Sequence, residues 1–139
     1  MALLDVNALV ALVWDSHVHH AAMRRWFARN GSEGWSTCPV TESGFVRVSS
    51  NPKVLAAPVT VSAARDVLRA LRANPHHGFL IDDVSVCQPD FPAVHGHRQL
   101  TDAHLLTLAR RHDQRLVTFD AGIAALDAGS GGVELLSGF

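Results

Sequence analysis

The sequence has two cysteines and a single lysine, Lys53, and it has no long apolar run. Cys38 and Cys87 do not form a Cys-x-x-Cys pair, which argues against a disulfide framework and against a zinc site built on cysteines. No stretch approaches the roughly 18 apolar residues of a transmembrane helix, and the first residues lack the positive start of a signal peptide. We therefore expect a soluble cytoplasmic protein with reduced thiols and no membrane contact.

The chain also lacks an excess of charge. Twelve Lys and Arg residues nearly balance thirteen Asp and Glu residues, and the formal net charge is -1. This excludes a protein that coats nucleic acid through its overall positive charge, so any such contact must come from local charge. With 139 residues, 47% of them hydrophobic, the chain can bury a core without disulfides. We expect one domain over residues 1–139.

Short apolar runs alternate with helical patterns along the whole chain. The apolar runs predict strands over residues 2–6, 35–38, 78–81, 115–118 and 133–136. Helical patterns lie between them, over residues 7–14, 18–29, 41–48, 61–73, 101–110 and 120–126. We expect three of these helices to begin at a polar N-cap, namely Asn7, Thr41 and Thr101. The alternation predicts an α/β fold, a parallel sheet with helices on both faces.

Four acidic residues follow strands or open helices in this scheme. Asp5 ends the first strand, Glu42 and Asp102 open helices, and Asp120 follows the strand over residues 115–118. The carboxyl ends of parallel strands share one edge of the sheet, so we expect the four carboxylates to meet in one cleft. Crowded carboxylates repel one another, and Mg²⁺ or Mn²⁺ relieves that repulsion. Such a site could hydrolyse a phosphodiester.

Each acid also has an ordinary interpretation as a helix-capping residue. Asp5 is the exception, because it interrupts an apolar strand, where a charge is costly without a partner. The joint placement of the four acids is more specific than any one of them.

Four short segments carry a resemblance to a known family. They are Leu4-Asp5-Val6-Asn7, Thr41-Glu42, Leu100-Thr101-Asp102-Ala103-His104 and Leu116-Val117-Thr118-Phe119-Asp120. Together they resemble the PIN-domain family, and within it the VapC-type toxin ribonucleases. The resemblance covers nearly the whole chain, and it implies a three-layer α/β/α sandwich around a central parallel sheet.

The resemblance also implies a function. It implies an Mg²⁺- or Mn²⁺-dependent endoribonuclease, the toxin of a type II toxin–antitoxin pair, which cuts a tRNA or rRNA loop and inhibits translation. Asp5 and Asp102 would be the principal metal ligands, Glu42 and Asp120 would complete the site, and two polar residues would orient the acids, Asn7 and Thr118. A VapB-type antitoxin would cover the cleft, and the toxin would form a homodimer, with a heterotetramer or larger assembly once the antitoxin binds.

Basic residues near the expected cleft are candidates for RNA contact. Arg24 and Arg25 share one helix, and Arg98 lies just before Asp102, so each could contact a phosphate. The alternative for each arginine is a solvated helix face. The nine histidines show no metal-binding motif, so we interpret them as surface residues.

Two other functions fit parts of the pattern. A receiver-type phosphoacceptor domain also has an acidic pocket at strand ends, but it needs a lysine late in the chain, and Lys53 lies in the middle. A catalytically inert PIN-like module would bind RNA or a partner without cutting. The presence of all four acids argues against that alternative, and measured Mn²⁺ binding would discriminate.

Overall fold

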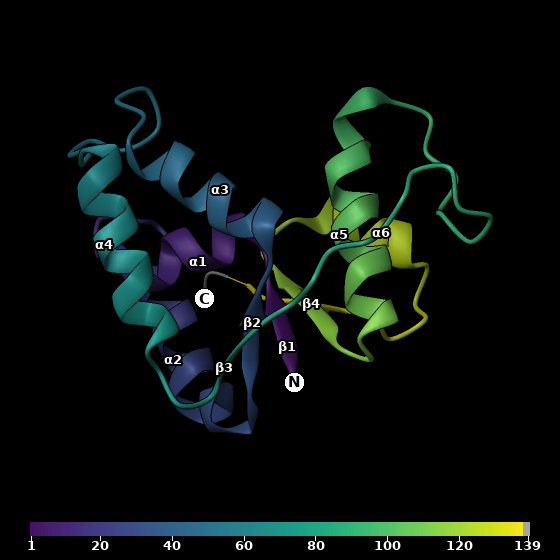
Figure 1. Ribbon diagram of the computed structural model, residues 1–139, viewed down its shortest axis with the longest axis horizontal. Helices are drawn as coiled ribbons and strands as arrows, with labels where there is room; N and C mark the ends of the chain where they lie inside the picture. Colours follow the sequence, from purple (N-terminus) through teal and green to yellow (C-terminus); the bar gives the residue numbers. More distant parts are fainter. Residues whose placement is uncertain (138–139) are drawn as a thin grey trace.

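A computed structural model describes residues 1–137 as a parallel sheet enclosed by helices (Figure 1). Five strands pair in the order β3-β2-β1-β4-β5, and every pairing is parallel. Leu3 of the central strand pairs with Ser36 on one side and with Leu116 on the other. The strands are β1 (Ala2–Leu4), β2 (Trp35–Thr37), β3 (His77–Phe79), β4 (Arg115–Thr118) and β5 (Val133–Leu135).

The helices cover both faces of the sheet. Figure 1 shows α1 to α4 on the left of the sheet and α5 and α6 on its right. They are α1 (Val6–Val13), α2 (His20–Asn30), α3 (Pro39–Ser49), α4 (Val61–Arg72), α5 (Leu100–Arg111) and α6 (Ala121–Asp127), with short 3-10 turns η1 (Gly31–Glu33) and η2 (His97–Gln99). This arrangement confirms the predicted α/β/α sandwich. None of the helices within residues 1–137 is long and apolar enough to span a membrane.

Two hydrophobic cores lie on the two faces of the sheet. Leu4 and Val117 join the core under α1 to α4, whereas Leu3 and Leu116 join the core under α5 and α6. Successive strand side chains point to opposite faces, so β1 needs apolar residues at every position. All three of its residues are buried. This explains why the first strand is a continuous apolar run in place of an alternating pattern.

The helix starts differ from the prediction. Asp5, not Asn7, is the N-cap of α1, and its Oδ1 accepts a hydrogen bond from the N–H of Val6 at 2.7 Å. The N-caps of α3 and α5 are Cys38 and Gln99, so Thr41 and Thr101 lie within the first turns. Each predicted N-cap was two or three residues late, because the helices begin almost directly after short strands or turns.

The remaining boundaries shift by small amounts. The first strand stops at Leu4 because Asp5 already caps the next helix, and β3 begins at His77, one residue before the predicted start. α2 begins at His20, two residues after the predicted start at Val18. The backbone carbonyl of His17 accepts the N–H of His20 in a turn that precedes the helix. The type of every predicted element is confirmed.

Candidate functional site

Three of the predicted acids line one cavity at the carboxyl edge of the sheet. Asp5 follows β1, Asp120 follows β4, and Asp102 lies in the first turn of α5. All three line a cavity of about 730 Å³, which we call the aspartate cavity. Strands β1 and β4 are neighbours in the sheet, and this adjacency brings residues more than a hundred positions apart to one place.

Asp5 is held by hydrogen bonds on both carboxylate oxygens. Its side chain is buried, and while Oδ1 accepts from the Val6 N–H, Oδ2 accepts from the Thr118 hydroxyl at 2.8 Å. Burial raises the pKa of the Asp5 carboxyl above its usual value, the two hydrogen bonds act to lower it, and the charge of Asp120 acts to raise it. The Thr118 hydroxyl also accepts the backbone N–H of Asp120 at 3.0 Å. Thr118 therefore fixes Asp5 and the backbone at Asp120 relative to each other.

Asp102 and Asp120 complete the acidic part of the cavity. Burial, followed by the charges of Asp5 and Asp120, raises the pKa of Asp102 to about 6. Asp120 is exposed and caps α6, where its Oδ1 accepts the N–H of Gly122 at 2.8 Å. The three carboxylates therefore repel one another at neutral pH, and a bound cation would relieve that repulsion.

Asn7 adds a polar oxygen to the same cavity. Asn7 lines the cavity together with Asp5. The Oδ1 atom of Asn7 is buried and has no hydrogen-bond partner among residues 1–137. An unpaired buried acceptor costs about 1–3 kcal/mol unless an ion or water satisfies it. Carboxylate and amide oxygens are the ligands that Mg²⁺ and Mn²⁺ prefer.

The donor set fits a cation that keeps much of its water. Within the described part of the chain, no three His, Cys, Asp or Glu side chains are grouped closely enough to hold an ion by themselves. Mg²⁺ usually binds proteins through one or two carboxylates, with water and substrate phosphate as its other ligands. The aspartate cavity can supply that smaller set.

Glu42 lies apart from the other three acids. Its Oε2 accepts the Thr37 hydroxyl at 2.7 Å, and its Oε1 lies 3.3 Å from a guanidinium nitrogen of Arg72 on α4. It lines a neighbouring pocket between α3 and α4 instead of the aspartate cavity. The expectation of four carboxylates in one cleft is therefore met by three, because contacts with β2 and α4 draw Glu42 away.

The predicted RNA-contacting arginines do not line the aspartate cavity. Arg24 lines an apolar groove between α1, α2 and α4, and Arg25 lies beside Trp26 on α2. Arg98 is exposed on η2, ahead of α5.

Two basic residues that line the cavity were not predicted to do so, since Arg47 was not singled out and His17 was interpreted only as a surface histidine. Arg47 had one available signal, because Ser43 and Arg47 lie four residues apart and mark a polar face of α3.

Comparison with known proteins gives consistent matches. The family model described as PIN domain matches residues 2–129. The chain is 64% identical over 126 residues to Ribonuclease VapC38 of Mycobacterium tuberculosis (strain ATCC 25618 / H37Rv), which covers 91% of this chain and 89% of that protein. It is 49% identical over 138 residues to Ribonuclease VapC39 of the same strain, covering 97% and 99%. Ribonuclease VapC44 is 42% identical over 126 residues, or 88% of each chain.

Proposed function

The chain belongs to the PIN-domain family, among its VapC-type members, and from this premise we propose that it is a metal-dependent endoribonuclease. The observation that carries the proposal is the aspartate cavity, where Asp5, Asp102 and Asp120 come together and the pKa of Asp102 is raised to about 6. The relatives named above are ribonucleases. Hydrolysis would add water across a P–O bond of RNA and leave a 5′-phosphate and a 3′-hydroxyl.

Asp5 and Asp102 would hold Mg²⁺ or Mn²⁺, with Asp120 and the Asn7 oxygen beside them. When bound, the ion supplies charge stabilisation for the phosphate and a lowered pKa for water. The protein's own contribution is orientation. The hydroxyl of Thr118 and the N–H of Val6 fix the Asp5 carboxylate, so its geometry is set before any substrate arrives.

For Glu42 we propose a supporting role. Its carboxylate is already engaged by Thr37 and Arg72. We therefore expect the loss of its charge to lower activity less than the loss of the Asp102 charge does.

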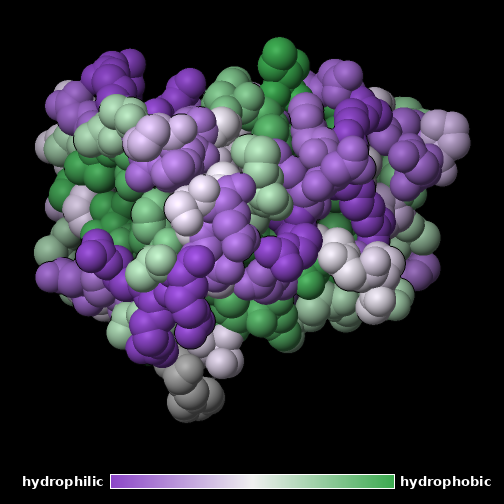
Figure 2. Space-filling model, turned by 90° about the horizontal axis from the view of Figure 1, so that it is seen from below, coloured by the Kyte–Doolittle hydropathy of each residue, from purple (hydrophilic) through white to green (hydrophobic). Residues whose placement is uncertain are grey.

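An antitoxin partner has support from the surface of the molecule. A groove of about 570 Å³ between α1, α2 and α4 is lined by apolar side chains, among them Leu12, Phe27 and Leu71. Figure 2 shows hydrophobic surface among hydrophilic residues on the left side, where α2 and α4 lie. Exposed apolar grooves mark protein–protein contacts. We propose a VapB-type antitoxin as the partner, a homodimer as the assembly of the toxin, and a heterotetramer or larger complex with antitoxin.

The proposed substrate is a tRNA or rRNA loop in the cytoplasm, and its cleavage would inhibit translation. This part of the proposal rests on family membership. Sequencing RNA ends after induced expression tests it directly, and a spread of cuts outside structured RNA would contradict it.

The enzymatic proposal is tested by charge-removing variants. Asp5→Asn and Asp102→Asn should each abolish Mn²⁺-dependent RNA cleavage and weaken Mn²⁺ binding in calorimetry, because each removes a proposed ligand charge. Glu42→Gln should retain more activity than either.

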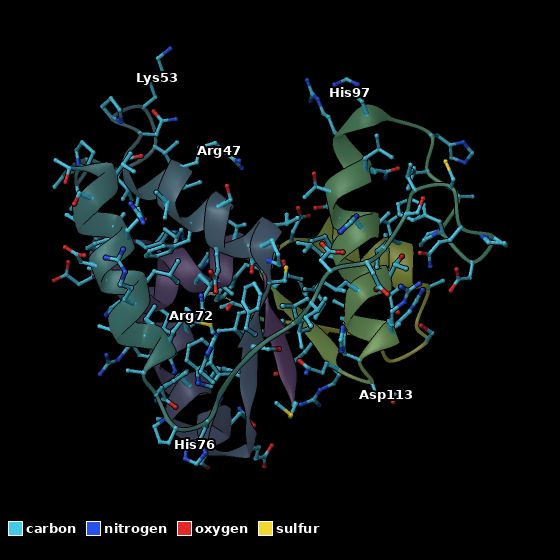
Figure 3. The ribbon with its side chains drawn as sticks, viewed as in Figure 1. Arg47, Lys53, Arg72, His76, His97 and Asp113 are labelled. Carbon is cyan, nitrogen blue, oxygen red and sulfur yellow. The ribbon has the colours of Figure 1, made fainter. Side chains whose placement is uncertain are left out.

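Asp113→Asn is the matched control. Asp113 is exposed just beyond the C-terminal end of α5, at the opposite end of that helix from His97 (Figure 3), and it has a φ of 55°, which asparagine tolerates well. This variant should cleave like the wild type. Full activity in both Asp5→Asn and Asp102→Asn, with native circular dichroism, would sink the assignment, and Mn²⁺ binding without cleavage would favour a non-cutting RNA-binding module.

A further inference from the structure

The aspartate cavity has an aliphatic side as well as an acidic one. Val18 precedes α2, Val48 lies on α3, and Val54 and Leu55 follow α3, and all four line the cavity. We call these four residues the aliphatic wall. Val18 and Val54 are among the large hydrophobic residues exposed on the surface, at 82% and 56% exposure. Such exposed aliphatic groups can contact the ribose or base of a bound nucleotide without selecting one base by hydrogen bonds.

Arg47 is the one Arg or Lys side chain, among the described residues, that lines this cavity. It is exposed on α3 and extends toward the side where α5 lies (Figure 3). No hydrogen bond or ion pair within residues 1–137 engages its guanidinium. Five other arginines each pair with an acid, namely Arg69, Arg72, Arg110, Arg111 and Arg115. The cavity therefore holds a cationic donor that its own carboxylates leave unpaired.

His17 supplies a neutral donor to the same cavity. Its Nδ1 lies 3.0 Å from the backbone N–H of His19 and accepts from it, so the proton of the neutral ring is on Nε2. Burial, followed by the charges of His19 and His20, lowers the pKa of His17 below its usual value. His17 thus adds an N–H and no charge at neutral pH, and the charge for binding an anion comes from Arg47.

We propose that Arg47 binds an RNA phosphate within the aspartate cavity, next to the phosphate that is hydrolysed, while the intervening nucleotide lies against the aliphatic wall. The inference rests on the proposed ribonuclease function and deepens it. A guanidinium binds phosphate oxygens in a bidentate way, and phosphate contacts dominate the affinity of proteins for nucleic acids. The volume of about 730 Å³ lies in the range of pockets that hold small ligands.

The RNA bound in the cavity must be single-stranded. A base that lies against aliphatic side chains has left its stack, which loops and ends of RNA permit and a continuous duplex resists. The wall offers no hydrogen bonds to base edges, so this nucleotide position should tolerate all four bases.

The test measures RNA binding in proteins that cannot cleave. Arg47→Ala is combined with Asp102→Asn, and a fluorescent single-stranded RNA of ten mixed nucleotides is titrated by anisotropy at several salt concentrations. Loss of one charge-assisted phosphate contact should raise Kd roughly tenfold and reduce the slope of log K against log salt by about one. Arg47→Lys should recover part of the affinity, since a point charge still attracts phosphate.

Arg29→Ala is the matched control, because Arg29 is also an exposed arginine on a helix but does not line the aspartate cavity. It should change neither Kd nor the salt slope. Equal effects of Arg47→Ala and Arg29→Ala would overturn the inference. A loss of Mn²⁺ affinity in the single variant Arg47→Ala would also overturn it, because Arg47 would then support the metal site and not the binding of substrate. RNA binding that depends on Arg47 in a protein that cleaves nothing would support the phosphate contact and contradict the ribonuclease function alone.

Discussion

The three aspartates of the cavity share a charge and differ in environment. Asp5 is only 7% exposed and hydrogen-bonded on both oxygens, whereas Asp120 is exposed and caps a helix. Asp102 lies between these extremes, and its partial burial beside two other carboxylates raises its pKa to about 6. Asp102 therefore gains a proton at a higher pH than a free aspartate does, and the charge of the free cavity changes as Asp102 titrates.

The raised pKa of Asp102 makes stability depend on pH. At Asp102 the folded protein binds the proton more tightly than the unfolded chain, so the contribution of this residue to the free energy of unfolding falls as pH rises from about 4 to about 6. Asp102→Asn should remove this loss and stabilise the metal-free protein at pH 7.5 by on the order of 1 kcal/mol after discounting for solvent screening. At pH 3.5 the variant and the wild type should unfold together. Urea denaturation in chelator at both pH values checks this, and equal stabilisation at both would contradict it.

The acids of the cavity were predictable from their placement along the chain. Asp5, Asp102 and Asp120 each adjoin an element whose position in a parallel sheet is fixed by topology. Glu42 and Arg47 were not predictable in this way, because the direction of a helical side chain depends on partners from distant segments. For Glu42 those partners are Thr37 and Arg72.

At the scale of elements, α3 approaches α1 very closely. A Cβ added at Gly44 would lie 2.5 Å from a methyl carbon of Val6, the residue next to Asp5. This close approach seats α3, and with it Arg47, against the helix that Asp5 caps. A glycine inside a helix costs about 1 kcal/mol relative to alanine. It is tolerated here because any larger residue would clash with Val6.

Gly44→Ala should therefore destabilise the protein in spite of its better helix propensity. Overpacking costs about 1–3 kcal/mol and outweighs the gain of about 1 kcal/mol, so the net loss should be about 1 kcal/mol. The second substitution Val6→Ala removes the clashing methyls, and the pair should show favourable coupling in a double-mutant cycle. Chemical denaturation measures both. Additive effects would show that the two helices adjust freely.

The type of each element followed from the sequence, and the helix starts did not. A cap depends on which residue leaves the strand conformation first, and tertiary packing decides that. Cys38 caps α3 because Pro39 suits the first helical position, and Thr41 then accepts the N–H of Cys38 from within the first turn.

For the whole molecule, strand order explains the place of the site. In the order β3-β2-β1-β4-β5, strands β2 and β3 are added on one side of β1, and strands β4 and β5 are added on the other side. The order of strand addition therefore reverses between β1 and β4. Ligands of open parallel sheets bind outside the carboxyl ends of the strands at such a reversal. The aspartate cavity lies there, with Asp5 directly after β1 and Asp120 two residues after β4. The formal net charge of -1 conceals this local concentration of acid.

Cation binding should stabilise the whole protein. A ligand that binds only the folded state adds about 2.7 kcal/mol at a hundred times its Kd, which raises Tm by several degrees. Mn²⁺ should therefore raise the Tm of the wild type and of Asp113→Asn, and leave that of Asp102→Asn nearly unchanged. Differential scanning calorimetry at pH 7.5 measures this. A rise of equal size in all three proteins would place the ion elsewhere.

Asp5 serves the fold and the site at once, since the same carboxylate caps α1 and lines the cavity. Asparagine caps helices about as well as aspartate, whereas alanine does not. Substitutions at this one position should therefore separate two properties. Asp5→Asn should change the cavity and keep the helix cap, whereas Asp5→Ala should change the cavity and also weaken the start of α1.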